Sequence, residues 1–347
     1  MLIFLNKSSS TKMKIIKLYL LFFTIIAVNI QAQSGQLFAS IGNFELVNGD
    51  TISDCKIGYR TFGKVNKDTS NVIIYCSWFE GTSEAIGSLI EKRNFIDTSK
   101  YFIIAFDALG NGVSTSPSNY PDSFPAITIR DMVNSQFIVL SDNLGIKHLH
   151  SAVGGSMGSM QVLEWAAAYP DFIDKIVAYV SSPKLSSYDL LWTNTQLKMI
   201  ETLKKYGAEE KEIKTLSKML TAWISRTPEY INAHIDINEF QSYLKFFEPD
   251  TLIPFTLDDY ISQMKAMIAH DISRDYNFSM EETAENIKAK LLIIASRNDM
   301  MVNPDESIKL AELTGAELII LDNNCGHLAV SCELEKIKNE IDLFLSN

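Results

Sequence analysis

A serine flanked by glycines is the feature of this sequence with the clearest chemical potential. Residues 154–158 read Gly-Gly-Ser-Met-Gly and lie between a short apolar run, residues 149–153, and a stretch with helical spacing, residues 161–166. A G-x-S-x-G sequence between a strand and a helix is typical of a sharp turn that exposes a serine hydroxyl. Gly154 and Gly158 would permit the close backbone approach of such a turn. The pattern predicts Ser156 as a nucleophile.

A serine nucleophile needs a histidine base and an acid that orients it, and on this type of scaffold both follow the serine, acid first. Of the five histidines, only His327 follows a late strand-like run, residues 316–321, and precedes the last helix pattern. Asp299 follows a continuous apolar run, residues 291–295, typical of a strand covered on both faces. We therefore expect His327 as base and Asp299 as acid. Asp305 is the alternative acid, although the dipole of a helix beginning there would also explain it.

Acyl transfer also requires hydrogen-bond donors for the oxyanion that forms on the attacked carbonyl. The first expected donor is the backbone amide of Met157, directly after the nucleophile. The second should lie in the loop after a strand predicted at residues 71–75. In that loop we predict the Phe79 amide, with Trp78 as the neighbouring alternative. Their two aromatic side chains fit a core and a pocket wall equally well.

Further segments match a known pattern: residues 106–114 (FDALGNGVS), residues 128–133 with Gln136, and residues 154–166. Together with Asp299 and His327, they resemble the homoserine O-acetyltransferase family of the α/β-hydrolase superfamily, and in particular its hydrolase-like branch. The resemblance implies an α/β fold with a mostly parallel sheet, helices on both faces and an inserted helical cap. It also implies a homodimer.

The same resemblance assigns roles to individual residues of this chain. Ser156, Asp299 and His327 correspond to the family's catalytic triad. Arg130 and Asp131 correspond to motif residues that hold the fold rather than react.

The residue after the histidine departs from the family's transferases. These carry an aspartate there that receives the substrate amino group, whereas this chain has Leu328. A leucine neither accepts a hydrogen bond nor pairs with an ammonium group. Ser159 likewise stands where the family usually has a second glycine. The family's substrate-binding arginine is not identified, and Arg226 and Arg274 are the candidates.

The chain alternates strand-like and helix-like segments at both ends, whereas its middle shows helical spacing alone. We predict an α/β-hydrolase core in two parts, residues 33–183 and 288–347, interrupted by a helical cap at residues 184–287. One helix face in that cap combines four apolar residues: Ile213, Leu216, Leu220 and Trp223.

Residues 1–32 are predicted to be a signal peptide. Lys12, Lys14 and Lys17 precede an apolar stretch at residues 18–28, and Ala32 offers a small residue for cleavage. Met13 is an alternative start. We expect a secreted or periplasmic protein without stable membrane insertion after cleavage. An uncleaved anchor is the alternative, although the apolar stretch is short for a full span.

Composition and cysteine spacing limit the partners and cofactors that this chain would have. Loss of the signal peptide removes four lysines and no acid, which changes the formal net charge from −11 to −15. A surface this acidic disfavours nucleic acid. The cysteines are too few and too irregularly spaced for a disulfide framework: Cys55, Cys76, Cys325 and Cys332. No pattern resembles a metal site, and neither a metal nor a cofactor is predicted.

These observations predict an exported serine-dependent hydrolase that cleaves a small-molecule ester through an acyl-enzyme. One alternative is an O-acyltransferase that uses acetyl-CoA, and another is a non-catalytic binding module on the same fold. Leu328 and export favour the hydrolase, because acetyl-CoA is a cytoplasmic metabolite. The order Ser156, Asp299, His327 argues against the binding module, which would not require all three residues.

Overall fold

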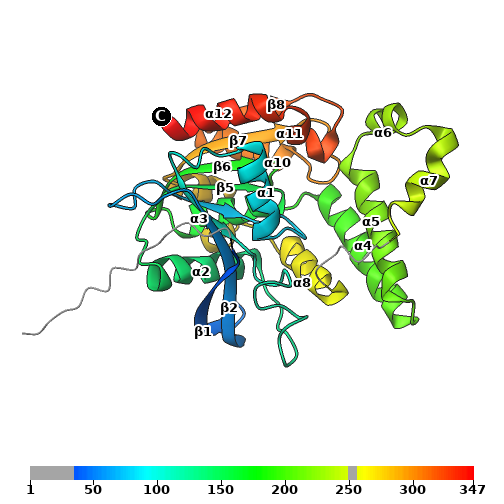
Figure 1. Ribbon diagram of the computed structural model, residues 1–347, viewed down its shortest axis with the longest axis horizontal. Helices are drawn as coiled ribbons and strands as arrows, with labels where there is room; N and C mark the ends of the chain where they lie inside the picture. Colours follow the sequence, from blue (N-terminus) through cyan, green and yellow to red (C-terminus); the bar gives the residue numbers. More distant parts are fainter. Residues whose placement is uncertain (1–34, 249–255) are drawn as a thin grey trace, which may run out of the picture.

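A central eight-stranded sheet organises the protein, whose computed structural model describes residues 35–248 and 256–347 (Figure 1). The strand order is β1-β2-β4-β3-β5-β6-β7-β8. The strands are β1 (Leu37–Glu45), β2 (Thr51–Phe62), β3 (Val72–Cys76), β4 (Phe102–Phe106), β5 (Leu149–Gly155), β6 (Ile173–Tyr179), β7 (Lys290–Ser296) and β8 (Glu317–Leu321). The predicted signal peptide, residues 1–32, lies outside the described residues.

The sheet is mostly parallel, as predicted. Strands β3 to β8 run parallel to their neighbours among them, while β1 is antiparallel to β2 and β2 to β4. Every residue of β3 and β4 is buried, which explains their uninterrupted apolar sequences. The strands predicted at residues 71–75, 149–153, 291–295 and 316–321 are present, with ends that differ by at most two residues.

Helices cover both faces of the sheet. Alternate residues of β3 point to opposite sides: Ile73 and Tyr75 pack with α1 and α12, whereas Val72 and Ile74 pack with α2, α3 and α10. These helices are α1 (Ser83–Arg93), α2 (Ile129–Ile138), α3 (Met157–Ala168), α10 (Asp305–Thr314) and α12 (Leu334–Ser346). The architecture is the predicted α/β-hydrolase fold, in which the carboxyl ends of the parallel strands share one edge.

A helical segment lies between β6 and β7, to one side of the sheet (Figure 1). It contains α4 (Ser187–Lys205), α5 (Glu210–Ser225), α6 (Pro228–His234), α7 (Phe240–Lys245), α8 (Leu257–Ile268) and α9 (Met280–Asn286). Its described residues contain no strand beyond an isolated bridge between Lys184 and Asp271. The limits of the cap at residues 184 and 287 stay a prediction. Within the part of the chain that the structure describes, no helix is long and apolar enough to cross a membrane.

Helix α5 is rotated relative to its predicted apolar face. Ile213 is buried, but Leu216 and Trp223 are 42% and 65% exposed. The buried stripe instead follows Ile213, Ser217 and Ile224. The side chains of these three residues also share one face of a helix with 3.6 residues per turn, so sequence spacing alone did not distinguish the two faces.

Candidate active site

Ser156 occupies a strained turn between β5 and α3. Its backbone angles are φ 55° and ψ −124°, in a region that residues with a side chain rarely adopt. A Cβ atom at Gly154 would overlap the carbonyl oxygen of Gly158, and a Cβ atom at Gly158 would overlap the carbonyl oxygen of Cys76. Both close approaches predicted from the sequence are therefore present, and they fix the serine at the carboxyl end of β5.

The structure brings Ser156, His327 and Asp299 together, although they are far apart in the sequence. His327 Nε2 lies 3.0 Å from Ser156 Oγ, and His327 Nδ1 lies 2.7 Å from Asp299 Oδ2. The histidine and the aspartate are 7% and 6% exposed. A buried carboxylate at this distance selects the tautomer that carries its proton on Nδ1 and leaves Nε2 free to accept one. Asp305, the alternative acid, is exposed in the first turn of α10.

The loop after β7 holds the Asp299 carboxylate in place. Its second oxygen, Oδ1, accepts hydrogen bonds from the amides of Met301 and Val302, at 2.8 and 2.9 Å. Helix α4 in turn holds this loop, because Asp189 Oδ1 accepts from the Asn303 amide at 2.9 Å. Burial raises the pKa of the Asp189 carboxyl above its ordinary value.

This contact between the helical segment and the acid loop was not predicted from the sequence. The S-x-x-D sequence that ends at Asp189 signals a helix start, and it does form a capping box with Ser186. A second contact also joins α4 to the loop, since Trp192 Nε1 donates to the Met301 carbonyl at 2.7 Å. Neither partner in the loop could be inferred from that local signal.

A short helical turn carries His327. It comprises η4 (Gly326–Leu328), which is followed directly by α11 (Ala329–Cys332). A disulfide joins Cys325 to Cys332, with a Cα–Cα distance of 6.6 Å. The number and spacing of the cysteines argued against a disulfide framework and did not predict this single bond. Its two cysteines lie on either side of the histidine.

The two amides expected to receive the oxyanion belong to different elements. Met157 begins α3, and Phe79 follows β3 in the loop of residues 77–82. Neither amide has a hydrogen-bond acceptor among the described residues. The adjacent Glu80 amide donates to Gln263 Oε1 of α8 at 3.4 Å, and the Phe79 ring packs on Tyr260 with a centroid distance of 4.5 Å. Helix α8 thus contacts the loop that presents the Phe79 amide.

Glu80, in the same loop, is an acid with a perturbed pKa. Burial raises the pKa of its carboxyl from 4.5 to about 7, although Lys218 and Lys214 of α5 oppose the shift. Its backbone is also in the left-handed region, with φ 62°. This loop therefore combines backbone strain with a titratable side chain between the core and the helical segment.

Comparison with known proteins adds to the geometry of the site. A family model described as alpha/beta hydrolase fold matches residues 77–331. The homoserine O-acetyltransferase of Trichormus variabilis is 31% identical over 314 residues, which cover 82% of this chain and 86% of that protein. The chain belongs to the homoserine O-acetyltransferase-like family of α/β hydrolases.

Esterases are also among the proteins to which this family member is similar. A probable esterase of Corynebacterium glutamicum is 28% identical over 323 residues, covering 88% of this chain and 93% of that protein. The crystal structure of an acetylester hydrolase from the same organism superposes with a TM-score of 0.79 at 26% identity, covering 90% of this chain and 95% of that one. The protein is therefore an enzyme of a class that contains esterases and acyltransferases.

The family's motif arginine joins the core to the helical segment. Arg130 of α2 forms ion pairs with the buried Glu164 of α3 and with Asp275, which follows α8. Asp131 caps α2 through Thr128 and accepts from the Val47 amide at 2.8 Å. No hydrogen bond among the described residues joins either of them to the Ser156–His327–Asp299 chain.

The two candidates for the family's substrate-binding arginine have other partners. Arg226 stacks over the Tyr230 ring, 4.3 Å from its centroid, and Arg274 Nε donates to the Asp271 carbonyl at 3.2 Å. Leu328 is 37% exposed beside the histidine. Ser159 Oγ donates to the Ser156 carbonyl at 2.5 Å, which turns its hydroxyl back onto the helix start.

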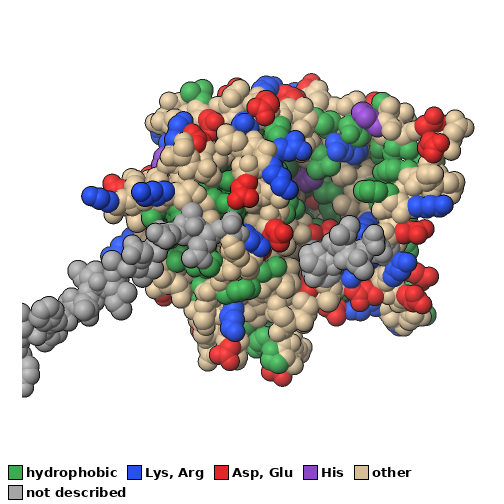
Figure 2. Space-filling view, in the orientation of Figure 1, with side chains coloured by type: hydrophobic (Ala, Val, Ile, Leu, Met, Phe, Trp, Pro, Cys, Tyr) green, Lys and Arg blue, Asp and Glu red, His purple; other side chains and the backbone are tan. Residues whose placement is uncertain are grey.

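A hollow separates the core from the helical segment on the face shown in Figure 2, and hydrophobic side chains gather on its walls. A hollow with apolar walls is suited to binding a small, weakly polar molecule. Among residues 35–248 and 256–347, no group of three or more His, Cys, Asp or Glu side chains is placed to hold a metal ion.

Proposed function

We propose that this enzyme is an exported serine esterase that hydrolyses a small-molecule ester through an acyl-enzyme. The observation that carries the proposal is the hydrogen-bonded chain from Asp299 through His327 to Ser156, with distances of 2.7 and 3.0 Å. Ser156 Oγ attacks the ester carbonyl carbon while His327 Nε2 accepts its proton. The Met157 and Phe79 amides donate to the oxyanion.

The second half of the reaction repeats the proton transfer with water. Collapse of the tetrahedral intermediate breaks the ester bond, and the departing alcohol takes the proton from His327. Water then attacks the acyl-serine, His327 accepts a proton from it, and the carboxylic acid leaves as Ser156 regains its hydrogen. Asp299 keeps its charge throughout and stabilises the imidazolium that forms twice.

Water is proposed as the final acceptor because of the side chain beside His327. Leu328 offers no acceptor to an ammonium group, so an amino acid such as homoserine has no partner at this point. The competing function is an O-acyltransferase that uses acetyl-CoA. The 31% identity to a homoserine O-acetyltransferase favours it. A binding module is the weakest candidate, because it would need no aligned proton-transfer chain.

Export is supported by two independent features of the chain. Residues 1–32 have the charge and hydropathy pattern of a signal peptide. The Cys325–Cys332 disulfide fits an oxidising compartment, where such bonds persist. N-terminal sequencing of the protein recovered outside the cytoplasm should begin near residue 33, whereas recovery of the full chain in the cytoplasm would contradict export.

The decisive experiment uses the mature protein, its Ser156→Ala variant, and Ser331→Ala, which changes an exposed serine, as the matched control. Turnover of p-nitrophenyl acetate and butyrate should fall by about 10³-fold or more in Ser156→Ala and stay unchanged in Ser331→Ala. Millimolar homoserine should not alter the rate. Formation of O-acetylhomoserine from acetyl-CoA would instead establish the transferase, and equal activity of Ser156→Ala would reject the serine mechanism.

A further inference from the structure

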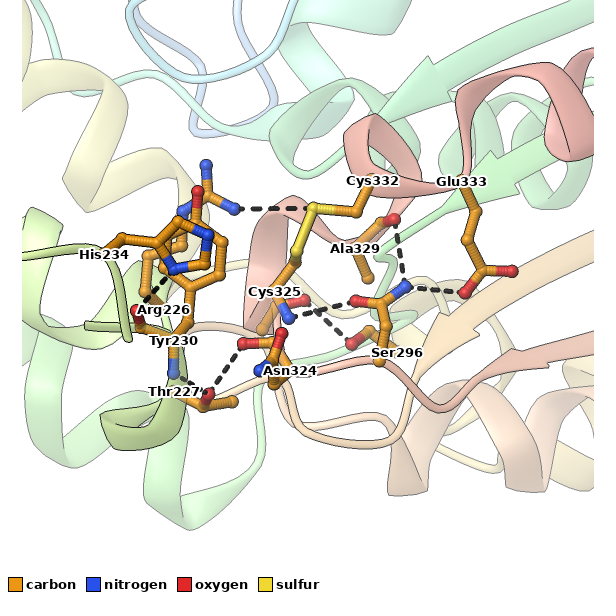
Figure 3. The surroundings of a disulfide bond; sticks show 12 residues. Arg226, Thr227, Tyr230, His234, Ser296, Asn324, Cys325, Ala329, Cys332 and Glu333 are labelled. Carbon is orange, nitrogen blue, oxygen red and sulfur yellow. Dashed lines mark hydrogen bonds between the residues drawn. A yellow bond between two sulfur atoms is a disulfide. The ribbon is translucent and has the colours of Figure 1, made fainter. Parts of the chain in front are cut away.

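His327 lies inside a short loop that a covalent bond closes. Cys325 and Cys332 are seven residues apart, and between them run η4 and α11, each no more than about one helical turn (Figure 3). Cys325 is buried at 4% exposure, whereas Cys332 is exposed. Helices this short have little stability of their own, so their position must come from other contacts.

Hydrogen bonds hold this loop on both sides of His327. Ser296 Oγ donates to the Gly326 carbonyl at 2.8 Å, and Thr227 Oγ1 donates to the Asn324 carbonyl at 2.6 Å. The second half is held by Asn323, whose Nδ2 donates to the Ala329 carbonyl at 3.3 Å and to Glu333 Oε1 at 2.7 Å. The disulfide adds a covalent tie between the two ends of a loop that these hydrogen bonds hold at only a few points (Figure 3).

The helical segment contacts the same loop through residues 225–226, which join α5 to α6. A Cβ atom at Gly326 would lie 2.9 Å from the Ser225 carbonyl oxygen, so the backbones are in close contact. Arg226 Nη1 lies 3.9 Å from Cys332 Sγ while its guanidinium stacks on the Tyr230 ring (Figure 3). The disulfide thus lies between the histidine loop and the junction of two cap helices.

We propose that the Cys325–Cys332 bond positions His327 for proton transfer, and that opening it slows catalysis more than it weakens substrate binding. The inference rests on the proposed serine mechanism. Transfer between Ser156 Oγ and His327 Nε2 requires a placement accurate to about half an ångström. Cross-linking both ends of an eight-residue segment removes alternative conformations of the residues between them. The two cysteines are positioning residues, because neither contacts the reacting atoms.

The bond can be opened in the wild-type protein. A thiolate of a dithiol attacks one sulfur of the disulfide and forms a mixed disulfide, while the other cysteine leaves as a thiolate. The second thiolate of the reagent then releases the first cysteine, so the protein gains two electrons and two protons and the dithiol becomes a cyclic disulfide. The exposed Cys332 sulfur is the accessible point of attack, so Cys325 is the thiolate that leaves first.

The test compares four proteins: the oxidised wild type, the dithiothreitol-reduced and alkylated wild type, the Cys325→Ser/Cys332→Ser double variant, and Ser331→Ala as control. Cys55 and Cys76 are fully buried, so alkylation of the folded protein should add two groups by mass. Circular dichroism and thermal melting establish that each protein is folded at the assay temperature. The probes are p-nitrophenyl acetate and diisopropyl fluorophosphate, which phosphorylates an activated serine without an acyl substrate.

Opening the bond should lower kcat by about tenfold and leave KM within about twofold, because the misplaced imidazole slows proton transfer but not binding. The rate of serine phosphorylation should fall by a similar factor, and the solvent deuterium isotope effect on kcat should increase. Ser331→Ala should match the oxidised wild type in all four quantities. If the double variant fails to fold, the reduced and alkylated wild type is compared with the oxidised wild type instead.

A lower melting temperature with unchanged kcat would overturn the proposal, since the disulfide would then only stabilise the fold. A rise in KM equal to the fall in kcat, or free thiols at both cysteines of the oxidised protein, would overturn it as well. Failure of the oxidised wild type to react with either probe would reject the serine mechanism together with this inference. Full activity of both redox forms would reject this inference alone.

Discussion

Ser156 Oγ and His327 Nε2 lie 3.0 Å apart, but different kinds of contact hold the two residues in place. The serine turn is fixed by backbone sterics, because Gly154, Gly158 and the end of β3 approach one another without room for side chains. The histidine loop is fixed by side-chain hydrogen bonds, one disulfide and contact with the helical segment.

This difference separates rigid from adjustable parts of the site. The serine turn joins β5 to α3 within the buried sheet, so distortion there must disturb the core. The histidine loop lies at the edge of the core, where several weaker contacts share the task of positioning. Changes in the serine turn should therefore abolish folding and activity together, whereas changes around the histidine should lower activity in steps.

The largest expected effect is that of Gly158→Ala. Its new Cβ would overlap the Cys76 carbonyl oxygen at the end of a fully buried strand. We expect the free energy of unfolding to fall by more than about 3 kcal/mol and ester turnover to disappear. Chemical denaturation and p-nitrophenyl acetate hydrolysis measure both. Gly35→Ala is the control, since no atom lies within 4 Å of its Cβ site. Wild-type stability of Gly158→Ala would show that backbone sterics do not fix the serine turn.

Asp299→Asn should leave the fold intact and still remove most activity. The asparagine keeps an oxygen for the Met301 and Val302 amides, but it no longer stabilises an imidazolium on the histidine loop. We expect kcat to fall by about 10³- to 10⁴-fold without a matching loss of stability. Asp305→Asn, at the start of α10, should stay within about twofold of the wild type. A larger loss in Asp305→Asn would show that the acid was wrongly assigned.

Thr227→Val tests a weaker contact of the histidine loop. It removes the 2.6 Å hydrogen bond to the Asn324 carbonyl and the side-chain cap of α6. We expect kcat to fall about three- to tenfold with little change in KM. Thr227→Ser keeps the hydroxyl and should restore the wild-type rate. A wild-type kcat in both variants would show that the loop needs no support from the helical segment.

The smallest expected effect is on the pH dependence of stability. It comes from the loop after β3, which belongs neither to the serine turn nor to the histidine loop. Since burial raises the pKa of Glu80 from 4.5 to about 7, the folded protein binds this proton more tightly than the unfolded chain. The resulting stabilisation is fully present below about pH 4.5 and is lost as the pH rises through about 7.

Replacement of this acid should remove that part of the pH dependence. The difference in unfolding free energy between about pH 5 and pH 8 should be smaller in Glu80→Gln than in the wild type. Denaturant titrations at both pH values measure it, with Glu91→Gln on the exposed side of α1 as the control. An unchanged difference in Glu80→Gln would mean that this carboxyl does not titrate between the two values.

Much of the fold could be predicted because its signals are local or periodic. The buried strands are uninterrupted apolar runs, since both faces of a parallel sheet are covered, and the serine turn is encoded within residues 154–158. The position of Asp299 and His327 after successive strands followed from the same alternation. Their catalytic roles, and those of the Met157 and Phe79 amides, remain proposals, and Asp299→Asn tests the role of the acid.

The sequence by itself determined four strands of the core (β3, β5, β7 and β8), their order, and which residues follow their carboxyl ends. Only the tertiary structure decided how α4, α5 and α8 meet those ends, and therefore the contacts Asp189–Asn303, Thr227–Asn324 and Gln263–Glu80. Such contacts join residues far apart in the chain, and they depend on the angle at which the helical segment packs. No local pattern encodes that angle, because either face of a helix such as α5 satisfies the same periodicity.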